Sequence, residues 1–339
     1  MSITGWGMSV PERTIHSAEL AAGFGLDEEW ITSRCGIRER RWVSPGQTTA
    51  SLAVEAGRRA LERAGCAPEE VAHLFVATAT PEQPSPATSA FVQHELGIRG
   101  SAHDVNAECA GFMYALVTAA ALIRIDPRPI LVIGSDTHSL TADPNDRDLG
   151  ILVGDGAGAL LLEPNDSEWI LGWDLGAEGR WTGSLKVEAG GSRLPASVET
   201  VEKGLHYAKI NGNEIYLNAV RLTVATLRKT LAQAGVDVSD VDLMIPHQAN
   251  IRIVNSIATH SGLDRSKVFT NLERYGNTAA ASIPIALTEA LTEGRIHEGD
   301  LVLLAGFGAG MTWGSMLLRW GGSVDAGAEE AGQQETAMA

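Results

Sequence analysis

The stretch LERAGCAPEEVAHLFV at residues 61–76 has a counterpart 170 positions later, LAQAGVDVSDVDLMI at residues 231–245. Each copy reads as the end of a helix, a glycine that stops the helix, a short loop and a buried strand. A second pair, ILVIG at 130–134 and VLLAG at 302–306, lies near the same spacing. Self-similarity at a nearly fixed offset predicts that the chain is a duplication of one structural unit.

The rest of the chain favours an α/β fold. Short apolar runs, which are typical of buried strands, alternate with longer amphipathic stretches, which are typical of helices. We expect strands at 73–78, 129–134, 158–163, 241–246 and 300–306, and helices at 51–64, 111–123, 214–234 and 282–293. Helix–AlaGly–strand units occur in many α/β proteins, so repetition without duplication is the alternative. Under duplication, we expect halves at 1–165 and 166–320 and a disordered acidic tail at 321–339.

Composition restricts the class of protein. The 339 residues include 26 Lys and Arg against 42 Asp and Glu, and the net charge of −16 argues against a binder of nucleic acid or of anionic membranes. We find no signal-peptide pattern and no apolar run of the roughly 18 residues that span a bilayer. There is also no CxxC or HExxH cluster to suggest a metal. We expect a soluble, cytoplasmic protein without a metal site.

Cys109 is the first candidate for chemistry. It lies between an expected strand, AHDVNAE at 102–108, and an expected helix, AGFMYALVTAAALI at 110–123. The dipole and free amides of a helix N-terminus stabilise a thiolate, so we expect a lowered pKa. A sharp strand-to-helix turn is also one way in which enzymes present a nucleophile. The alternative is a buried structural cysteine, and this is our interpretation of Cys35 and Cys66.

Two polar residues of the second half are further candidates. His247 follows the expected strand VDLMIP, at the strand end where α/β sheets carry their sites. Asn277 precedes an expected helix. A packing role for His247 and an N-cap role for Asn277 are the alternatives. The glycines of GFGAG at 306–310 lack the lysine of a phosphate-binding loop, and no GxGxxG follows the first strand, so we expect no nucleotide cofactor. One Cys with a His and an Asn fits acyl transfer through a thioester.

Four motifs resemble one known family. They are DVNAECAGFMYAL around Cys109, PHQANIRI around His247, RYGNTAAASIPIAL around Asn277, and GFGAGMTWGS at 306–315. In this order they closely resemble β-ketoacyl-acyl-carrier-protein synthase III, the initiating condensing enzyme of the thiolase superfamily. The resemblance covers nearly the whole chain except the tail. It implies a duplicated thiolase-like fold with five α/β/α/β/α layers, and a homodimer.

The resemblance also implies a role for each candidate. Cys109 would take an acyl group from a coenzyme A thioester. His247 and Asn277 would bind the thioester carbonyl of a malonyl group while it loses CO₂, because two neutral donors stabilise the developing enolate. The backbone amides of Cys109 and Ala309 would form the oxyanion hole. No cofactor is expected beyond the coenzyme A thioesters, which are substrates.

A coenzyme A entrance needs arginines for phosphate and an aromatic face for adenine. By resemblance, the residues that match it are Trp30 and Arg147 for adenine, Arg34 for phosphate, and Asn213 and Asn250 for the pantetheine arm. Taken alone, each would be an ordinary surface residue.

Two departures from the family pattern concern the acyl group. Glu108 precedes the nucleophile where a small or neutral residue is usual. An ionised carboxylate there would raise the pKa of the thiol, unless a salt bridge holds it. Ser85 falls near the position of a bulky residue that gates the acyl pocket, which favours a longer or branched acyl group.

A third departure concerns the surface that docks the acidic carrier protein. Leu217, Thr259 and His260 occupy positions that are often basic in the family. The remaining positive charge is mainly that of Arg252, with Arg221 as a second contributor. We therefore expect weak use of a carrier protein and better use of malonyl-coenzyme A than in a typical relative.

These features support one function ahead of two alternatives. The favoured function is decarboxylative condensation of an acyl-coenzyme A primer with malonyl-acyl-carrier protein or malonyl-coenzyme A, in fatty-acid or polyketide initiation. One alternative is acyl transfer to a hydroxyl, an amine or a carrier protein without condensation, which would not need Asn277. The other alternative is a catalytically silent subunit, which the joint presence of Cys109, His247 and Asn277 argues against.

Overall fold

Two mixed sheets form the framework of the protein. The computed structural model describes residues 1–165 and 169–321. The first sheet has the order β1-β7-β6-β4-β5, and the second has the order β11-β12-β13-β8. The strands of the first sheet are β1 (Ser2–Ser9), β7 (Asp155–Glu163), β6 (Ile130–Thr137), β4 (His73–Ala77) and β5 (Ser101–Val105). The strands of the second sheet are β11 (Leu243–Pro246), β12 (Leu301–Gly308), β13 (Gly310–Arg319) and β8 (Ile170–Trp181).

The repeated segment has the same backbone structure in both copies. Helices α3 (Thr49–Ala64) and α8 (Gly212–Ala234) each end at a glycine, Gly65 and Gly235, with φ of 65°. A side chain at such a φ would be strained, which is why glycine ends both helices. A short 3₁₀ turn follows each glycine, and then a buried strand, β4 or β11. The duplication predicted from these segments is confirmed.

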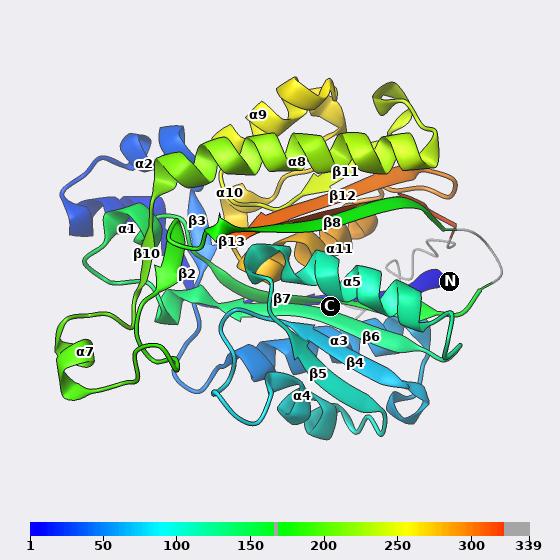
Figure 1. Ribbon diagram of the computed structural model, residues 1–339, viewed down its shortest axis with the longest axis horizontal. Coiled ribbons are helices and arrows are strands. Elements are labelled where there is room, and N and C mark those ends of the chain that lie inside the picture. The colour runs from blue at the N-terminus through cyan, green and yellow to red at the C-terminus, as the bar shows by residue number, and fades with distance from the viewer. Residues whose placement is uncertain (166–168, 322–339) are drawn as a thin grey trace, which may run out of the picture.

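The elements stack in five layers (Figure 1). Helices α3 and α4 (Thr88–Leu96) cover one face of the first sheet, whereas α8 and α9 (Ile251–Ser261) cover the outer face of the second. Between the sheets lie α5 (Gly111–Leu122) and α11 (Ser282–Thr292), which contact both. Their sequences are apolar on nearly every side because both faces of this layer are buried. The α/β/α/β/α thiolase-like architecture is therefore confirmed.

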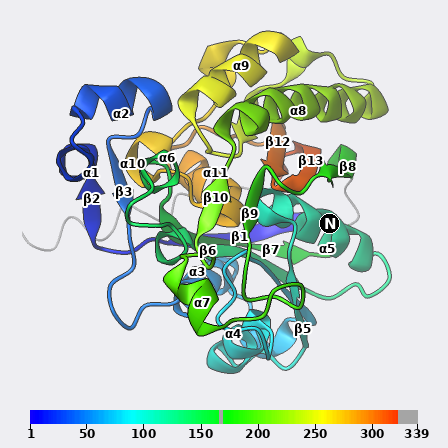
Figure 2. The ribbon, with the colours of Figure 1, turned by 60° about the vertical axis from the view of Figure 1, so that its left-hand side comes forward.

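Smaller elements flank these layers. Figure 2 shows α2 (Glu28–Cys35) next to α9, and β10 (Ala208–Ile210) beside α6 (Arg147–Gly150). These smaller elements are α1 (Ser17–Phe24), α2 (Glu28–Cys35), β2 (Thr14–His16), β3 (Glu39–Arg41), α6 (Arg147–Gly150), β9 (Leu185–Val187), α7 (Val198–Glu202), β10 (Ala208–Ile210) and α10 (Leu272–Tyr275).

Every strand and helix that we expected is present, with ends that differ by a few residues. Strand β6 shows why the ends differ. It runs beyond the apolar stretch into Ser135, Asp136 and Thr137, which are buried and hydrogen-bonded. Apart from Gly321, the expected acidic tail at 321–339 lies outside the described residues. Within residues 1–165 and 169–321, no helix is both long and apolar enough to cross a membrane.

Candidate active site

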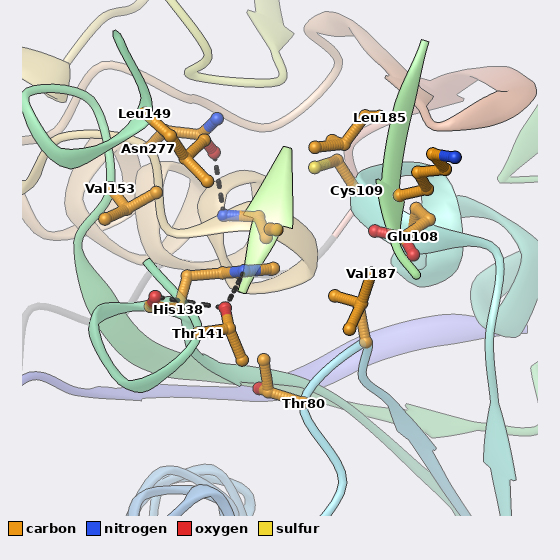
Figure 3. A pocket seen from close by; sticks show the side chains of 14 residues that line it. Thr80, Glu108, Cys109, His138, Thr141, Leu149, Val153, Leu185, Val187 and Asn277 are labelled. Atoms are coloured by element: carbon orange, nitrogen blue, oxygen red, sulfur yellow. Dashed lines mark hydrogen bonds between the residues drawn. The ribbon is translucent and has the colours of Figure 1, made fainter. Parts of the chain in front are cut away.

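Residues of both halves line two neighbouring cavities. The larger has a volume of about 710 Å³ and is lined by Cys109, His247, Asn277 and Ala309, among others. The smaller has a volume of about 60 Å³ and shares Cys109 and Asn277 with it. Figure 3 looks into the smaller cavity, with Cys109 on one side and Asn277 on another. The structure thus brings together the three side chains that the sequence proposed for chemistry.

A tight turn presents Cys109. Strand β5 ends at Val105, a 3₁₀ turn spans Glu108–Ala110, and α5 begins directly after it. The end of β12 packs against this turn through the backbone of Gly308. A Cβ atom on Gly308 would lie 2.8 Å from the Cys109 backbone nitrogen and 2.9 Å from the Ala107 carbonyl oxygen. Only glycine permits this approach, which also brings Ala309 to the wall of the cavity.

The pKa of Cys109 differs from the sequence-based expectation. We expected the helix N-terminus to lower it, but burial of the thiol raises the pKa well above its ordinary value. The charges of Glu108 and then Asp136 raise it further, and only a backbone hydrogen bond opposes them. A thiolate is poorly solvated in a closed site, and two nearby carboxylates repel it. The resting side chain of Cys109 is therefore the protonated thiol.

His247 is held as a neutral hydrogen-bond donor. It follows β11 directly, its ring is buried, and its Nδ1 lies 2.7 Å from Ser282 Oγ. That hydroxyl already accepts the backbone N–H of Gln248 at 3.3 Å. Nδ1 is the acceptor available for the Ser282 proton in the described chain, so the ring proton sits on Nε2. Burial lowers the pKa of His247 to about 3.

Asn277 is oriented by its own turn. Its Oδ1 accepts the backbone N–H of Ala279 at 2.9 Å, so the amide NH₂ remains available on the side of the cavities. Its backbone N–H donates to Leu152 O at 2.8 Å, and its carbonyl accepts from Gly154 N at 2.9 Å. The N-cap alternative is wrong, because α11 begins five residues later, at Ser282, with no side-chain cap.

Sequence reasoning missed a buried carboxylate that connects the two halves. Asp136 accepts hydrogen bonds from the backbone of Ala79, from both groups of Thr80 and from the backbone of Ala280. Ala280 belongs to the turn that leads from Asn277 into α11. Asp136 therefore positions that turn against the first sheet. The available signal was a charged residue directly after an apolar strand pattern.

The residues matched to coenzyme A lie at the larger cavity. Both Arg34 and Arg147 place their guanidinium groups over the Trp30 ring, at 4.1 and 5.4 Å from its centroid. The residues that line the cavity are Trp30, Arg34, Asn213 and Asn250. Arg147 is not part of this lining, but its guanidinium group contacts the ring of Trp30. The side chain of Asn250 also caps α9 by accepting the Arg252 N–H at 2.8 Å. The cluster presents positive charge and an aromatic face at one end of the cavity.

The proposed docking surface lies on α8 and α9. Arg252 lines the larger cavity and lies 5.8 Å from the centroid of the Tyr216 ring. Leu217 is 68% exposed, so the surface presents an apolar side chain at a position that is often basic in the family. Two arginines that the sequence did not single out also contact α9 or its end: Arg228 through His260 O, and Arg265 through Asn255.

Ser85, which the sequence proposed for the acyl pocket, reaches neither cavity within one chain. It is exposed and lines neither cavity, because its loop is tied to the helices beside it. Glu82 accepts the backbone N–H of Ala50 and donates its own N–H to the Thr88 hydroxyl. The wall beside Cys109 is formed instead by Ala79 and Thr80.

Comparison with known proteins gives a consistent result. Residues 103–179 match the model "3-Oxoacyl-[acyl-carrier-protein (ACP)] synthase III", and residues 231–320 match its C-terminal counterpart. A beta-ketoacyl-[acyl-carrier-protein] synthase III from Symbiobacterium thermophilum is 46% identical, over 95% of this chain and 98% of its own length. The Thermus thermophilus enzyme of that name has a TM-score of 0.89 at 38% identity, over 95% of this chain and 100% of its own.

A third relative comes from a polyketide pathway. The priming beta-ketosynthase of the R1128 polyketide biosynthetic pathway has a TM-score of 0.87 at 33% identity, with 94% of this chain and 96% of that chain covered. Fold, motifs and full-length similarity agree, and the chain therefore belongs to the 3-oxoacyl-[acyl-carrier-protein] synthase III family of condensing enzymes.

Proposed function

We propose that the protein joins an acyl primer to a malonyl thioester by decarboxylative Claisen condensation, with Cys109 as the acyl carrier. The observation that carries this proposal is the meeting of three groups at one cavity: the Cys109 thiol, the Nε2–H side of His247 and the amide of Asn277. Acyl transfer alone would need the thiol and an oxyanion hole. The two neutral donors are what an enolate requires.

The first step is acylation of Cys109. The thiol sulfur attacks the carbonyl of an acyl-coenzyme A, and the backbone amides of Cys109 and Ala309 stabilise the tetrahedral oxyanion. The bond to coenzyme A then breaks, and the thiol proton ends on the released coenzyme A thiol. Trp30, Arg34 and Arg147 would hold the adenine and phosphates at the cavity entrance.

The second step uses the donors of the second half. The malonyl thioester binds with its carbonyl oxygen at His247 Nε2–H and the Asn277 amide. Loss of CO₂ leaves an enolate whose charge these donors stabilise. Its carbon attacks the acyl carbonyl on Cys109, and the Cys109 sulfur leaves as a thiolate that is then reprotonated. The product is a 3-oxoacyl thioester, two carbons longer than the primer.

A panel of second substrates separates this function from simple acyl transfer. The acyl-enzyme is formed with an acyl-coenzyme A and followed by intact mass. Malonyl-acyl-carrier protein, malonyl-coenzyme A and an alcohol or amine are then added separately. Condensation predicts that only the malonyl thioesters discharge Cys109. Discharge to the alcohol or amine alone would instead establish the acyltransferase alternative.

The neutral state of His247 gives a pH prediction. With a pKa lowered to about 3, the ring does not titrate between about pH 5 and pH 8, whereas an ordinary histidine changes charge in that interval. We expect the rate of CO₂ release from malonyl-coenzyme A by preformed acyl-enzyme to show no inflection from His247 there. An inflection near pH 6.5 that disappears in His247→Gln would contradict the assigned state.

We also propose that Arg252 guides the carrier protein. The chain carries a net charge of −16, so it repels an acidic carrier unless a local positive group focuses the field. Arg252→Glu is expected to lower condensation with malonyl-acyl-carrier protein by about tenfold at low salt, with a smaller effect on acylation by acyl-coenzyme A. The measurement is the condensation rate with both malonyl donors across a salt series.

Arg58→Glu is the matched control, because it makes the same charge change on α3, in the opposite outer layer. Equal losses in the two variants would show that net charge, rather than a docking surface, controls the rate. Salt-independent rates with the carrier protein in wild type and Arg252→Glu would remove the docking argument.

A homodimer is proposed on the basis of family membership and the edge of the first sheet. Strand β5 pairs only with β4 in the described chain, and its side chains are half-buried or exposed. An unpaired edge strand is suited to pairing with a second copy. Light scattering at micromolar concentration should give twice the chain mass, and a monomer there would contradict the proposal. The cytoplasmic location expected from the sequence stays a prediction.

A further inference from the structure

We infer that the small cavity beside Cys109 selects an acyl group that carries a hydrogen-bond donor, a hydroxyl or an amino group, through Glu108 and His138. This inference rests on the proposed acyl–Cys109 intermediate and deepens it by naming the class of primer. Three observations carry it: the size of the cavity, a carboxyl without hydrogen-bond donors, and a buried ring nitrogen without a partner.

The cavity fits a short acyl chain. Its volume of about 60 Å³ corresponds to roughly four to six water-sized groups. The cavity can therefore hold about four non-hydrogen atoms beyond the thioester carbonyl. A butyryl chain with one substituent on its third carbon has that number: its second, third and fourth carbons and the substituent atom. Part of the wall is apolar, formed by Leu149, Val153, Leu185 and Val187 (Figure 3).

Glu108 supplies the first unmet acceptor. Figure 3 shows its carboxyl group on the cavity side, next to Cys109. Its backbone N–H is bonded to Asn106, but in residues 1–165 and 169–321 its carboxyl has neither an ion pair nor a hydrogen bond. Asp136, by contrast, is surrounded by backbone and hydroxyl donors. A half-buried carboxyl without donors is costly, and a ligand can supply the missing donor.

His138 supplies the second acceptor. Its Nε2 is buried without a partner in the described structure, and the nearest carboxylate oxygen, on Asp136, is 4.0 Å away. Its Nδ1 lies 3.2 Å from the Thr141 hydroxyl, which itself donates to the His138 carbonyl at 3.1 Å. Because that hydroxyl gives its one proton to the carbonyl, Nδ1 donates to the hydroxyl, which leaves Nε2 as the ring's acceptor.

Two acceptors in one small cavity favour an acyl substituent that donates. A methyl group at the same place would displace water from the Glu108 carboxyl without replacing its hydrogen bonds, and it would leave His138 Nε2 without a partner. A hydroxyl or an ammonium group would satisfy them. Sites built to bond a polar substituent reject its apolar isostere more strongly than apolar sites reject a polar one. The primer class is therefore a short 3-hydroxyacyl or 3-aminoacyl thioester.

The test compares three coenzyme A thioesters of nearly equal shape: 3-hydroxybutyryl, 3-aminobutyryl and 3-methylbutyryl. The second-order rate of adduct formation on Cys109 is measured for each by intact mass, with acetyl-coenzyme A as a reference. We expect the hydroxyl or the amino compound to exceed the methyl compound by about tenfold or more in wild type. Equal rates, or a faster methyl compound, would overturn the inference.

Variants show whether the two side chains cause the preference. Glu108→Leu and His138→Leu should each reduce the ratio of polar to methyl rates towards one or below it. Glu108→Gln distinguishes the two donors, since a neutral amide keeps a bond to a hydroxyl but loses the attraction for an ammonium. Glu202→Gln, at an exposed position on α7, is the matched control and should keep the wild-type ratio. A preference unchanged in Glu108→Leu and His138→Leu would also overturn the inference.

The outcomes separate this inference from the proposed function. If no thioester, acetyl-coenzyme A included, gives an adduct on Cys109, the proposed function fails. If acetyl and methyl compounds acylate Cys109 and the polar compounds have no advantage, only the primer inference fails.

Discussion

Cys109→Ala is expected to form no acyl adduct with any acyl-coenzyme A and to make no condensation product. The variant removes the sulfur that would carry the acyl group, and the remaining donors have nothing to act on. The loss should be complete within the sensitivity of intact-mass detection. Because alanine is smaller and Cys109 lies in a turn held by Gly308 and Thr312, the fold should be retained. Thermal unfolding checks that point.

Two other cysteines make this experiment decisive. Cys35 lines the larger cavity and is buried, with its thiol donating to Ile31 O at 3.1 Å. Cys66 lies after α3, and burial raises its pKa to about 11. Cys35→Ala and Cys66→Ala should both acylate as wild type does. A stoichiometric thioester that persists in Cys109→Ala and disappears in Cys35→Ala would show that Cys35 is the nucleophile and that the assignment to Cys109 is wrong.

His247→Ala and Asn277→Ala should separate the two chemical steps. Both variants are expected to acylate Cys109, because neither residue acts on the primer carbonyl in this scheme. Each should lose CO₂ release by about 10²- to 10³-fold, the usual effect of removing one donor from a developing oxyanion. The measurement is a single turnover in which acyl-enzyme and malonyl-coenzyme A are mixed, with CO₂ and product followed together.

Ser282→Ala is the control for orientation, since it leaves His247 in place but removes its Nδ1 partner. An intermediate loss that appears in CO₂ release and not in acylation would fit a positioning role. If His247→Ala or Asn277→Ala impaired acylation and left CO₂ release from malonyl-coenzyme A unchanged, the division of roles between the halves would be wrong.

The repeated segment shows what local sequence can predict. A helix that ends at Gly65 or Gly235 and a following apolar strand depend on residues close together in the chain. Their positions were therefore predictable, whereas the five layers were expected only from the resemblance of the motifs to a known family. The meeting of Cys109, His247 and Asn277 was predictable only through the resemblance of their motifs to a known family, because they lie far apart in sequence.

Burial accounts for what the sequence did not predict. The helix N-terminus near Cys109 was visible in the sequence, but the burial that reverses the expected direction of its pKa depends on the whole fold. The same holds for Asp136, whose partners come from the loop after β4 and from the turn before α11. Glu108 was noticed as unusual in the sequence. Only the structure places it with His138 in one cavity.

The most direct test of the central claim is the stoichiometry of one turnover. Acyl-enzyme is isolated free of acyl-coenzyme A and mixed with malonyl-coenzyme A, and three quantities are followed: acyl groups lost from Cys109, CO₂ released, and 3-oxoacyl thioester formed. Condensation through Cys109 predicts equal amounts of all three, with a product two carbons longer than the primer. Loss of the acyl group from Cys109 without matching CO₂ release and carbon–carbon bond formation would contradict the account.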